Sequence, residues 1–141
     1  MASANTKQGT VDGFFGTFQV NPASVATFPI PMYSRMKFIA GGFIDICALA
    51  TDLADVVLYQ PAPAVGAWVT VRFINAGGTI YAICGTANTI TASAAVYSFT
   101  NGQIATTIGT GHLVGRSISD GTAGNPCVII PVSGDSTTIV S

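Results

Sequence analysis

The sequence predicts an all-β protein, a compact β-barrel or β-sandwich of the jelly-roll-like kind with an extended N-terminal arm. Its apolar residues are dominated by β-branched side chains, with 27 Ile and Val against four Leu. Such side chains lose rotamer freedom in helices and pack well on a pleated sheet. The 16 Gly and seven Pro are spread along the chain. That spread is typical of many short strands joined by tight turns.

Charged residues are scarce in this chain. They make up 8% of its 141 residues, and none lies between Phe73 and Gly115. An ordinary soluble domain has about 25%. The net charge of −1 argues against nucleic acid as a partner. Because no window supplies about 20 predominantly apolar residues, a membrane span is not expected either.

The first 35 residues differ from the rest, and we interpret residues 1–35 as an extended arm and residues 36–141 as the β domain. The arm contains four of the eight Phe and three of the seven Pro. Each Pro in the segment Phe28–Met32 forces its predecessor into an extended conformation. An arm cannot bury its own aromatic rings, so it must lie against this domain or against another chain. The predicted contact residues are Phe14, Phe15, Phe18, Phe28, Ile30 and Tyr33.

From Met36 onward, apolar runs alternate with turn signals and predict eight to ten strands. The segment Leu49–Tyr59 is ambiguous, because its Leu and Val spacing also fits a helix, whereas Asp55–Tyr59 fits a strand. The other predicted strands are Met36–Ala40, Phe43–Ala50, Trp68–Asn75, Thr79–Cys84, Ala94–Thr100, Gln103–Thr107, Leu113–Ser119, Cys127–Val132 and Thr137–Val140.

Two turns predict β-hairpins. Gly77-Gly78 joins Trp68–Asn75 to Thr79–Cys84, and Asn101-Gly102 joins the two strands around it. Asn-Gly between apolar runs is the strongest short hairpin signal, because both residues accept a positive φ.

The sequence also contains a loose internal echo. The segments 58–73 and 116–131 each run as a strand, a small-residue turn ending in Gly66 or Gly124, and a β-branched strand. Identities are few, so the echo indicates a duplication only as a possibility.

No pattern of residues predicts catalysis, a cofactor or a metal site, and we expect no enzyme activity. His112 is the only histidine and lies among glycines, where a polar loop residue is expected. Asp52 and Asp55 fit turn or capping roles better than a pair of catalytic carboxylates. The three cysteines lack metal or disulfide spacing and are expected to be buried free thiols: Cys47, Cys84 and Cys127.

The C-terminal half resembles the capsid decoration, or cement, proteins of tailed phages. The resemblance covers a Val-Tyr strand, an Asn-Gly hairpin, a strand with a central glycine, and a glycine before a Val-rich strand. The matching segments are Ala94–Tyr97, Asn101–Ala105, Gly111–Ile118, Gly124 and Val128–Val132.

The resemblance implies a head-stabilising protein made in the host cytoplasm and bound to the outer surface of the capsid. Its partners would be the major capsid protein and further copies of itself, as a homotrimer, with no cofactor. An alternative is a glycan-binding β module of a virion fibre or surface adhesin, for which an exposed Trp68 and tyrosines would supply the platform. A small-molecule-binding barrel is a third class and would need a large apolar cavity.

Overall fold

The computed structural model describes residues 10–12, 14–85, 89–107 and 109–132, and it confirms the all-β class. Its described part has thirteen strands and two short 3-10 turns, so the strands are more numerous and shorter than predicted. The predicted strand Thr137–Val140 lies outside the described residues.

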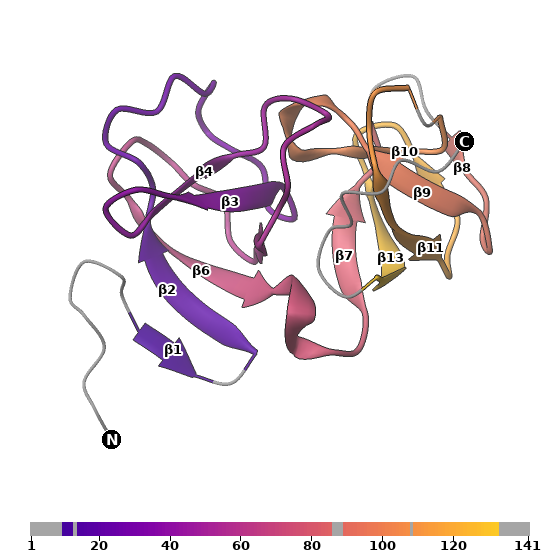
Figure 1. Cartoon of the computed structure of the whole chain (residues 1–141), viewed down its shortest axis with the longest axis horizontal. Coiled ribbons are helices and arrows are strands. Elements are labelled where there is room, and N and C mark those ends of the chain that lie inside the picture. The colour runs from indigo at the N-terminus through magenta and orange to yellow at the C-terminus, as the bar shows by residue number, and fades with distance from the viewer. Residues whose placement is uncertain (1–9, 13, 86–88, 108, 133–141) are drawn as a thin grey trace.

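Two antiparallel sheets lie side by side, one formed before the Gly77-Gly78 turn and one after it (Figure 1). The first has the order β1-β2-β6-β5-β3-β4, and the second has the order β10-β9-β11-β13-β7. The first sheet consists of β1 (Thr10–Asp12), β2 (Phe15–Gln19), β3 (Arg35–Ile39), β4 (Phe43–Ile46), β5 (Val56–Leu58) and β6 (Trp68–Phe73). The second part comprises η1 (Ile74–Ala76), β7 (Ile80–Ile83), β8 (Thr89–Ile90), β9 (Ala95–Ser98), η2 (Thr100–Gly102), β10 (Ile104–Ala105), β11 (Leu113–Ser117), β12 (Gly121–Thr122) and β13 (Pro126–Pro131).

Most strands lie where the residue pattern predicts them, and the ambiguous segment 49–59 contains strand β5 rather than a helix. The Asn101-Gly102 hairpin is confirmed, with φ of 57° and 69° at its two turn residues. The predicted hairpin across Gly77-Gly78 is wrong. Strand β6 pairs with β2 and β5, whereas β7 pairs with β13 in the other sheet. This turn therefore moves the chain from one sheet to the next.

The predicted arm lies against its own domain. Strand β2 pairs with β6 over its whole length, and the boundary at residue 35 falls at the first residue of β3, inside the same sheet. Residues 21–34 form no strand of their own and are not extended as predicted, because the N–H of Ser24 donates to Asn21 and that of Ser34 donates to Pro31 in two turns. They are tied to the first sheet by the isolated bridge between Ile30 and Ala62.

The two sheets have the same topology, which substantiates the internal echo. Strands β2, β3, β4, β5 and β6 correspond in chain order and in spatial order to β7, β9, β10, β11 and β13. We call residues 15–74 the first repeat and residues 80–132 the second repeat. Each repeat curls into a small, partly closed barrel, because the residue after its first strand forms a parallel bridge to its third strand. These bridges are Val20–Ile44 and Cys84–Ile104.

The correspondence extends to single hydrogen bonds outside the sheets. After the first strand, the N–H of Val20 donates to Ala67 and the N–H of Gly66 donates back to Val20. The second repeat has the same two bonds, at Cys84–Asn125 and Gly124–Cys84. Two non-glycine residues with positive φ also correspond, and each donates its N–H across the barrel: Tyr33 to Leu58 and Ser93 to Ser117. Such detail indicates a tandem duplication of one five-stranded unit.

The repeats differ in how one barrel end is filled. In the first repeat three rings occupy this end, with centroids 5.0 Å apart for Phe18–Phe38 and 5.9 Å for Phe18–Phe73. By register, the corresponding positions of the second repeat are Ala82, Ser98 and Pro131, which are much smaller. The second barrel therefore cannot fill this end with its own side chains.

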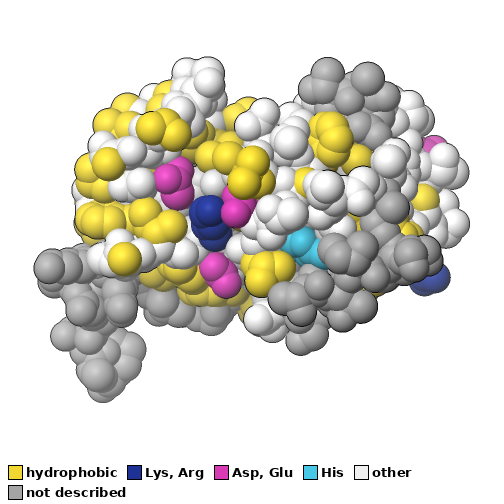
Figure 2. Space-filling view, turned by 45° about the horizontal axis from the view of Figure 1, so that its top comes forward, with side chains coloured by type: hydrophobic (Ala, Val, Ile, Leu, Met, Phe, Trp, Pro, Cys, Tyr) yellow, Lys and Arg dark blue, Asp and Glu magenta, His cyan; other side chains and the backbone are white. Residues whose placement is uncertain are grey.

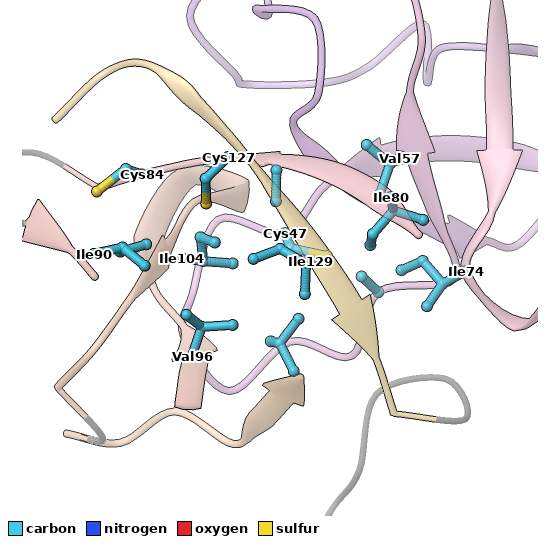
Figure 3. Close-up of a cluster of buried hydrophobic side chains, with 13 residues drawn as sticks. Cys47, Val57, Ile74, Ile80, Cys84, Ile90, Val96, Ile104, Cys127 and Ile129 are labelled. Atoms are coloured by element: carbon cyan, nitrogen blue, oxygen red, sulfur yellow. The ribbon is translucent and has the colours of Figure 1, made fainter. Parts of the chain in front are cut away.

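The first repeat supplies the missing volume. Cys47, Ala54, Val57 and Ile74 all belong to the hydrophobic cluster of the second repeat. In Figure 3, Val57 and Ile74 lie beside Ile80, and Cys47 lies beside Ile129 in the same cluster. Full burial of a Val or Ile side chain stabilises a fold by about 1.5–3 kcal/mol. The two repeats are thus joined through a shared core.

Backbone contacts fix the same junction. The N–H of Gly102 donates to the carbonyl of Cys47 at 2.7 Å, and the N–H of Asn101 donates to Ala48 at 3.0 Å. A Cβ on Gly102 would lie 2.7 Å from the carbonyl oxygen and 2.9 Å from the nitrogen of Arg35. Only a residue without a side chain permits this approach of the two repeats.

Gly102→Ala is expected to lower the free energy of unfolding by about 2–4 kcal/mol, because backbone overlap adds to the strain of a positive φ. Gly124→Ala is the matched control. Gly124 has a φ of +79° against +69° at Gly102, and open space lies around it. The control should cost only the conformational strain, about 1–2 kcal/mol. Urea denaturation of both variants measures the difference, and equal losses would contradict a tight junction at Gly102.

Candidate interaction surface

One outer face of the first sheet carries aromatic side chains. Along β2 and β6 every second residue points inward, so that Phe18, Val69 and Val71 are buried in the core. The residues between them face outward and include Phe15 and Trp68, which are 39% and 47% exposed. We call the exposed and half-buried rings on this side the aromatic band, which consists of Phe14, Phe15, Tyr33, Tyr59, Trp68 and Tyr81.

The tyrosines of the band join the two repeats. The ring of Tyr33 packs edge-on against Tyr59 at 5.2 Å and stacks on Tyr81 of strand β7 at 4.9 Å. Phe15 packs against the other side of Tyr59 at 5.5 Å. The N–H of Tyr81 donates to the Tyr59 hydroxyl at 3.4 Å, and burial raises the pKa of that hydroxyl. The band therefore runs without a break from β2 to β7.

Arg72 lies between the two phenylalanines at the β2 end of the band. Its guanidinium carbon is 5.0 Å from the ring centroid of Phe14 and 5.7 Å from that of Phe15. Its Nη2 donates to the carbonyl of Gly77 at 2.6 Å. These contacts hold the two rings in place at the surface, since cation–π pairs contribute about 0.5–2 kcal/mol.

The structure divides the residues predicted for the arm into two groups. Phe14, Phe15 and Tyr33 come together in the aromatic band. Phe18 and Ile30 are buried in the core of the first repeat, and Phe28 is half-buried against that core. These last three fill this chain's own interior because the arm packs on the sheet that it belongs to.

Sequence reasoning did not find Tyr59, Tyr81 and Arg72 as parts of this surface. A usable signal existed for Arg72, since it occupies an outward position of the alternating strand β6 together with Trp68. The tyrosines are distant in sequence and meet only because β7 packs against β5.

A second surface is hollowed and lies where the first repeat meets the η2 hairpin of the second. A groove of about 480 Å³ is lined by parts of residues 25–34, by β3 and β4, and by the η2 hairpin. Lys37 forms an ion pair of 3.0 Å with Asp52, and Asp45 accepts hydrogen bonds from Asn21 and Ser24. Figure 2 shows acidic side chains around a basic one, bordered by hydrophobic side chains. Asp52 accepts the backbone N–H of Leu49 within a turn, as predicted. Asp55 instead accepts the backbone N–H of Phe38 and ties β3 to the residue before β5.

A Ser–His pair lies in the junction between the repeats and has a structural role. The Ser98 hydroxyl donates to the carbonyl of Ala50 at 2.5 Å and accepts the backbone N–H of His112 at 2.9 Å. The Nδ1 of His112 is 3.2 Å from the same hydroxyl. Both residues are buried, so the hydroxyl is committed to backbone groups within the core.

Two further ionisable groups border this pair. The side chain of Arg35 is fully buried, and burial lowers the pKa of its guanidinium. Burial, with the nearby Arg35 charge, lowers the pKa of His112 to about 4, so the imidazole is neutral at neutral pH. The free thiol of Cys47 is also buried, and burial raises its pKa to about 12. The prediction of buried free thiols is confirmed for all three cysteines.

Within the described residues no three His, Cys, Asp or Glu side chains gather as a metal site would require. No helix in that part of the chain is long and apolar enough to span a membrane.

Comparison with known proteins finds a counterpart of this fold among solved structures. No protein-family model and no curated protein matches the chain. Among solved structures, it is similar to the N base of head fiber gp8.5 from bacteriophage phi29, with a TM-score of 0.63. The match covers 86% of this chain and 98% of the phi29 chain at 14% sequence identity. At this identity the likeness establishes a shared fold.

Acidification is expected to destabilise the protein through His112. The unfolded chain binds a proton near pH 6.5 and the folded chain only near pH 4. The contribution of neutral His112 to the free energy of unfolding is therefore fully present above pH 6.5. It is lost as the pH drops toward 4, and the loss is roughly 1–3 kcal/mol after allowance for solvent screening. Urea denaturation at a series of pH values, compared with His112→Asn, measures this contribution. A wild-type pH profile parallel to that of the variant would exclude His112 as its source.

Proposed function

We propose that this protein is a structural component of a phage virion, a decoration module that binds the major capsid protein on the outer surface of the head. The observation that carries the proposal is the shared fold with a head fiber base over 98% of the length of that chain. The resemblance of the C-terminal half to decoration proteins independently favours the same role. We further propose that the copies on the head are homotrimers.

The aromatic band supplies a suitable contact surface for the capsid. Centres of protein interfaces are enriched in Tyr, Trp, Phe and Arg and depleted in acidic residues. The band consists of Phe, Tyr and Trp side chains around Arg72. Its Phe and Tyr rings are already held by one another and by Arg72, so binding would order few of these side chains. Head stabilisation would then result from buried area, with no chemical step.

Glycan binding is the second candidate. Trp68 favours it, because the ring is 47% exposed and could stack on a sugar face. The tyrosines favour it less, since Tyr33 and Tyr81 stack on each other and cover one face of each ring. Binding of the intact protein to a glycan array, lost in Trp68→Ala, would support this function.

Purified protein is expected to co-sediment with undecorated heads and to raise their resistance to heat. Phe14→Ala with Trp68→Ala should weaken head binding at least tenfold, because truncation of aromatic anchors at an interface typically costs about 1–2 kcal/mol each. Val25→Ala is the control, since Val25 is 99% exposed and lies outside the band. Wild-type protein that stays in the supernatant would contradict the decoration role. Unchanged head binding by the double variant would show that another surface of the protein makes the contact with the capsid.

A further inference from the structure

The two repeats pack head to tail, so that one surface of the first repeat meets a different surface of the second. Each repeat therefore also has a surface, equivalent to the one its partner uses, that takes no part in the junction. The first repeat contributes the outward face of β3 and β5, where Arg35 pairs with Val57. The second repeat contributes its barrel end, with Ser98, Gly102 and His112. Because different surfaces meet, the described residues leave the β9–β11 face of the second repeat and the barrel end of the first repeat uncovered. Figure 1 shows β9 and β11 on the side of the second sheet away from the first.

Register identifies the residues on these two free surfaces. The cross-strand pair Arg35–Val57 corresponds to Ala95–Arg116, and both of these residues are exposed. Ser98 corresponds to Phe38, which is 38% exposed. The residue before β11, His112, corresponds to Leu53, which is 41% exposed. Residues buried in the junction inside the chain thus have exposed counterparts at its two ends.

In the junction and on the free surfaces, large and small side chains occupy opposite partners of the contact. Inside the chain the first repeat contributes the large Arg35, whose backbone lies against Gly102, and the barrel end of the second repeat contributes the small Ser98. On the free surfaces the large residues Phe38 and Leu53 are on the barrel end, and the small Ala95 is on the opposite face. A large-for-small exchange conserves the volume at a contact, which packed interfaces require.

Charges on the free surfaces are complementary. Asp55 is exposed beside Phe38, because its Oδ2 accepts the N–H of that residue at 2.9 Å. The opposite free surface carries Arg116, also exposed. Complementary charges at a rim set register and exclude wrong pairings.

We propose that copies of this chain associate head to tail, with the β9–β11 face of one copy on the first barrel end of the next. The contact repeats the intrachain junction in its orientation, with Ala95 receiving Phe38 and Leu53, and with Arg116 facing Asp55. Such a contact closes into a ring if its rotation permits, and the ring then contains twice as many barrels as chains. The proposal concerns contact between copies and stands independently of binding to a head.

Charge reversal in the full-length protein tests the contact. Wild-type protein should sediment as an oligomer that dissociates on dilution. Arg116→Asp and Asp55→Arg should each weaken self-association at least tenfold, and the two changes in one chain should restore it. Asp120→Arg is the control for Asp55→Arg, since Asp120 also accepts one backbone N–H, from Ala92 at 2.8 Å. Sedimentation velocity over a concentration series gives the masses.

Wild-type protein that stays monomeric at its highest soluble concentration would overturn the proposal, as would single reversals that leave the oligomer intact. Ala95→Arg, a change at an exposed position, decides the matter if either charge reversal unfolds the chain: it should block association, and an unaffected oligomer would overturn the contact. Head binding is read separately by co-sedimentation, so its failure does not count for or against this interface.

Discussion

The filling of the second barrel by the first repeat is the contact on which the rest of the structure depends. The second barrel has Ala82 and Ser98 where the first has Phe18 and Phe38, so its end stays unfilled until Val57 and its neighbours enter. An unfilled cavity of that kind costs several kcal/mol in a protein core. The two repeats are therefore one cooperative unit, although each has its own full set of five strands. The aromatic band depends on the same contact, because Tyr33 and Tyr59 meet Tyr81 only when the repeats are docked.

Duplication followed by divergence explains why the two barrels are alike in register and unlike in side chains. The positions that fix the backbone are retained: the glycines Gly66 and Gly124, and the positive-φ residues Tyr33 and Ser93. The positions that fill space have changed together, with three phenylalanines at one barrel end and small residues at the other. A symmetric pair with two open ends would continue to add units without limit. The phenylalanine-filled end of the first repeat needs no side chains from a further barrel to complete its core, so that another copy would meet only its exposed surface.

Period-two alternation and turn chemistry predicted most strands because each depends on neighbouring residues. Trp68–Asn75 alternates as β6 does, and Asn101-Gly102 forms its hairpin. The Gly77-Gly78 turn was misassigned for a physical reason: a turn sequence specifies the bend, whereas pairing depends on which strand lies alongside. Phe15 was found as a surface ring through composition alone. Tyr59 and Tyr81 could not be found, because their contact depends on the docking of two repeats that share few identities.

The few charged residues of this chain lie in particular parts of the folded structure. Of five basic residues, Arg35 is enclosed in the repeat junction and Arg72 supports the aromatic band, so neither serves mainly to hold the protein in water. Carboxylates gather instead around Lys37, on the side of the groove. A carboxylate in an aromatic surface would have to be desolvated when a partner covers it, at a cost of several kcal/mol. The aromatic band itself consists of Phe, Tyr and Trp rings with Arg72, and so avoids that cost. The low charge content thus agrees with the contact surfaces proposed for this protein.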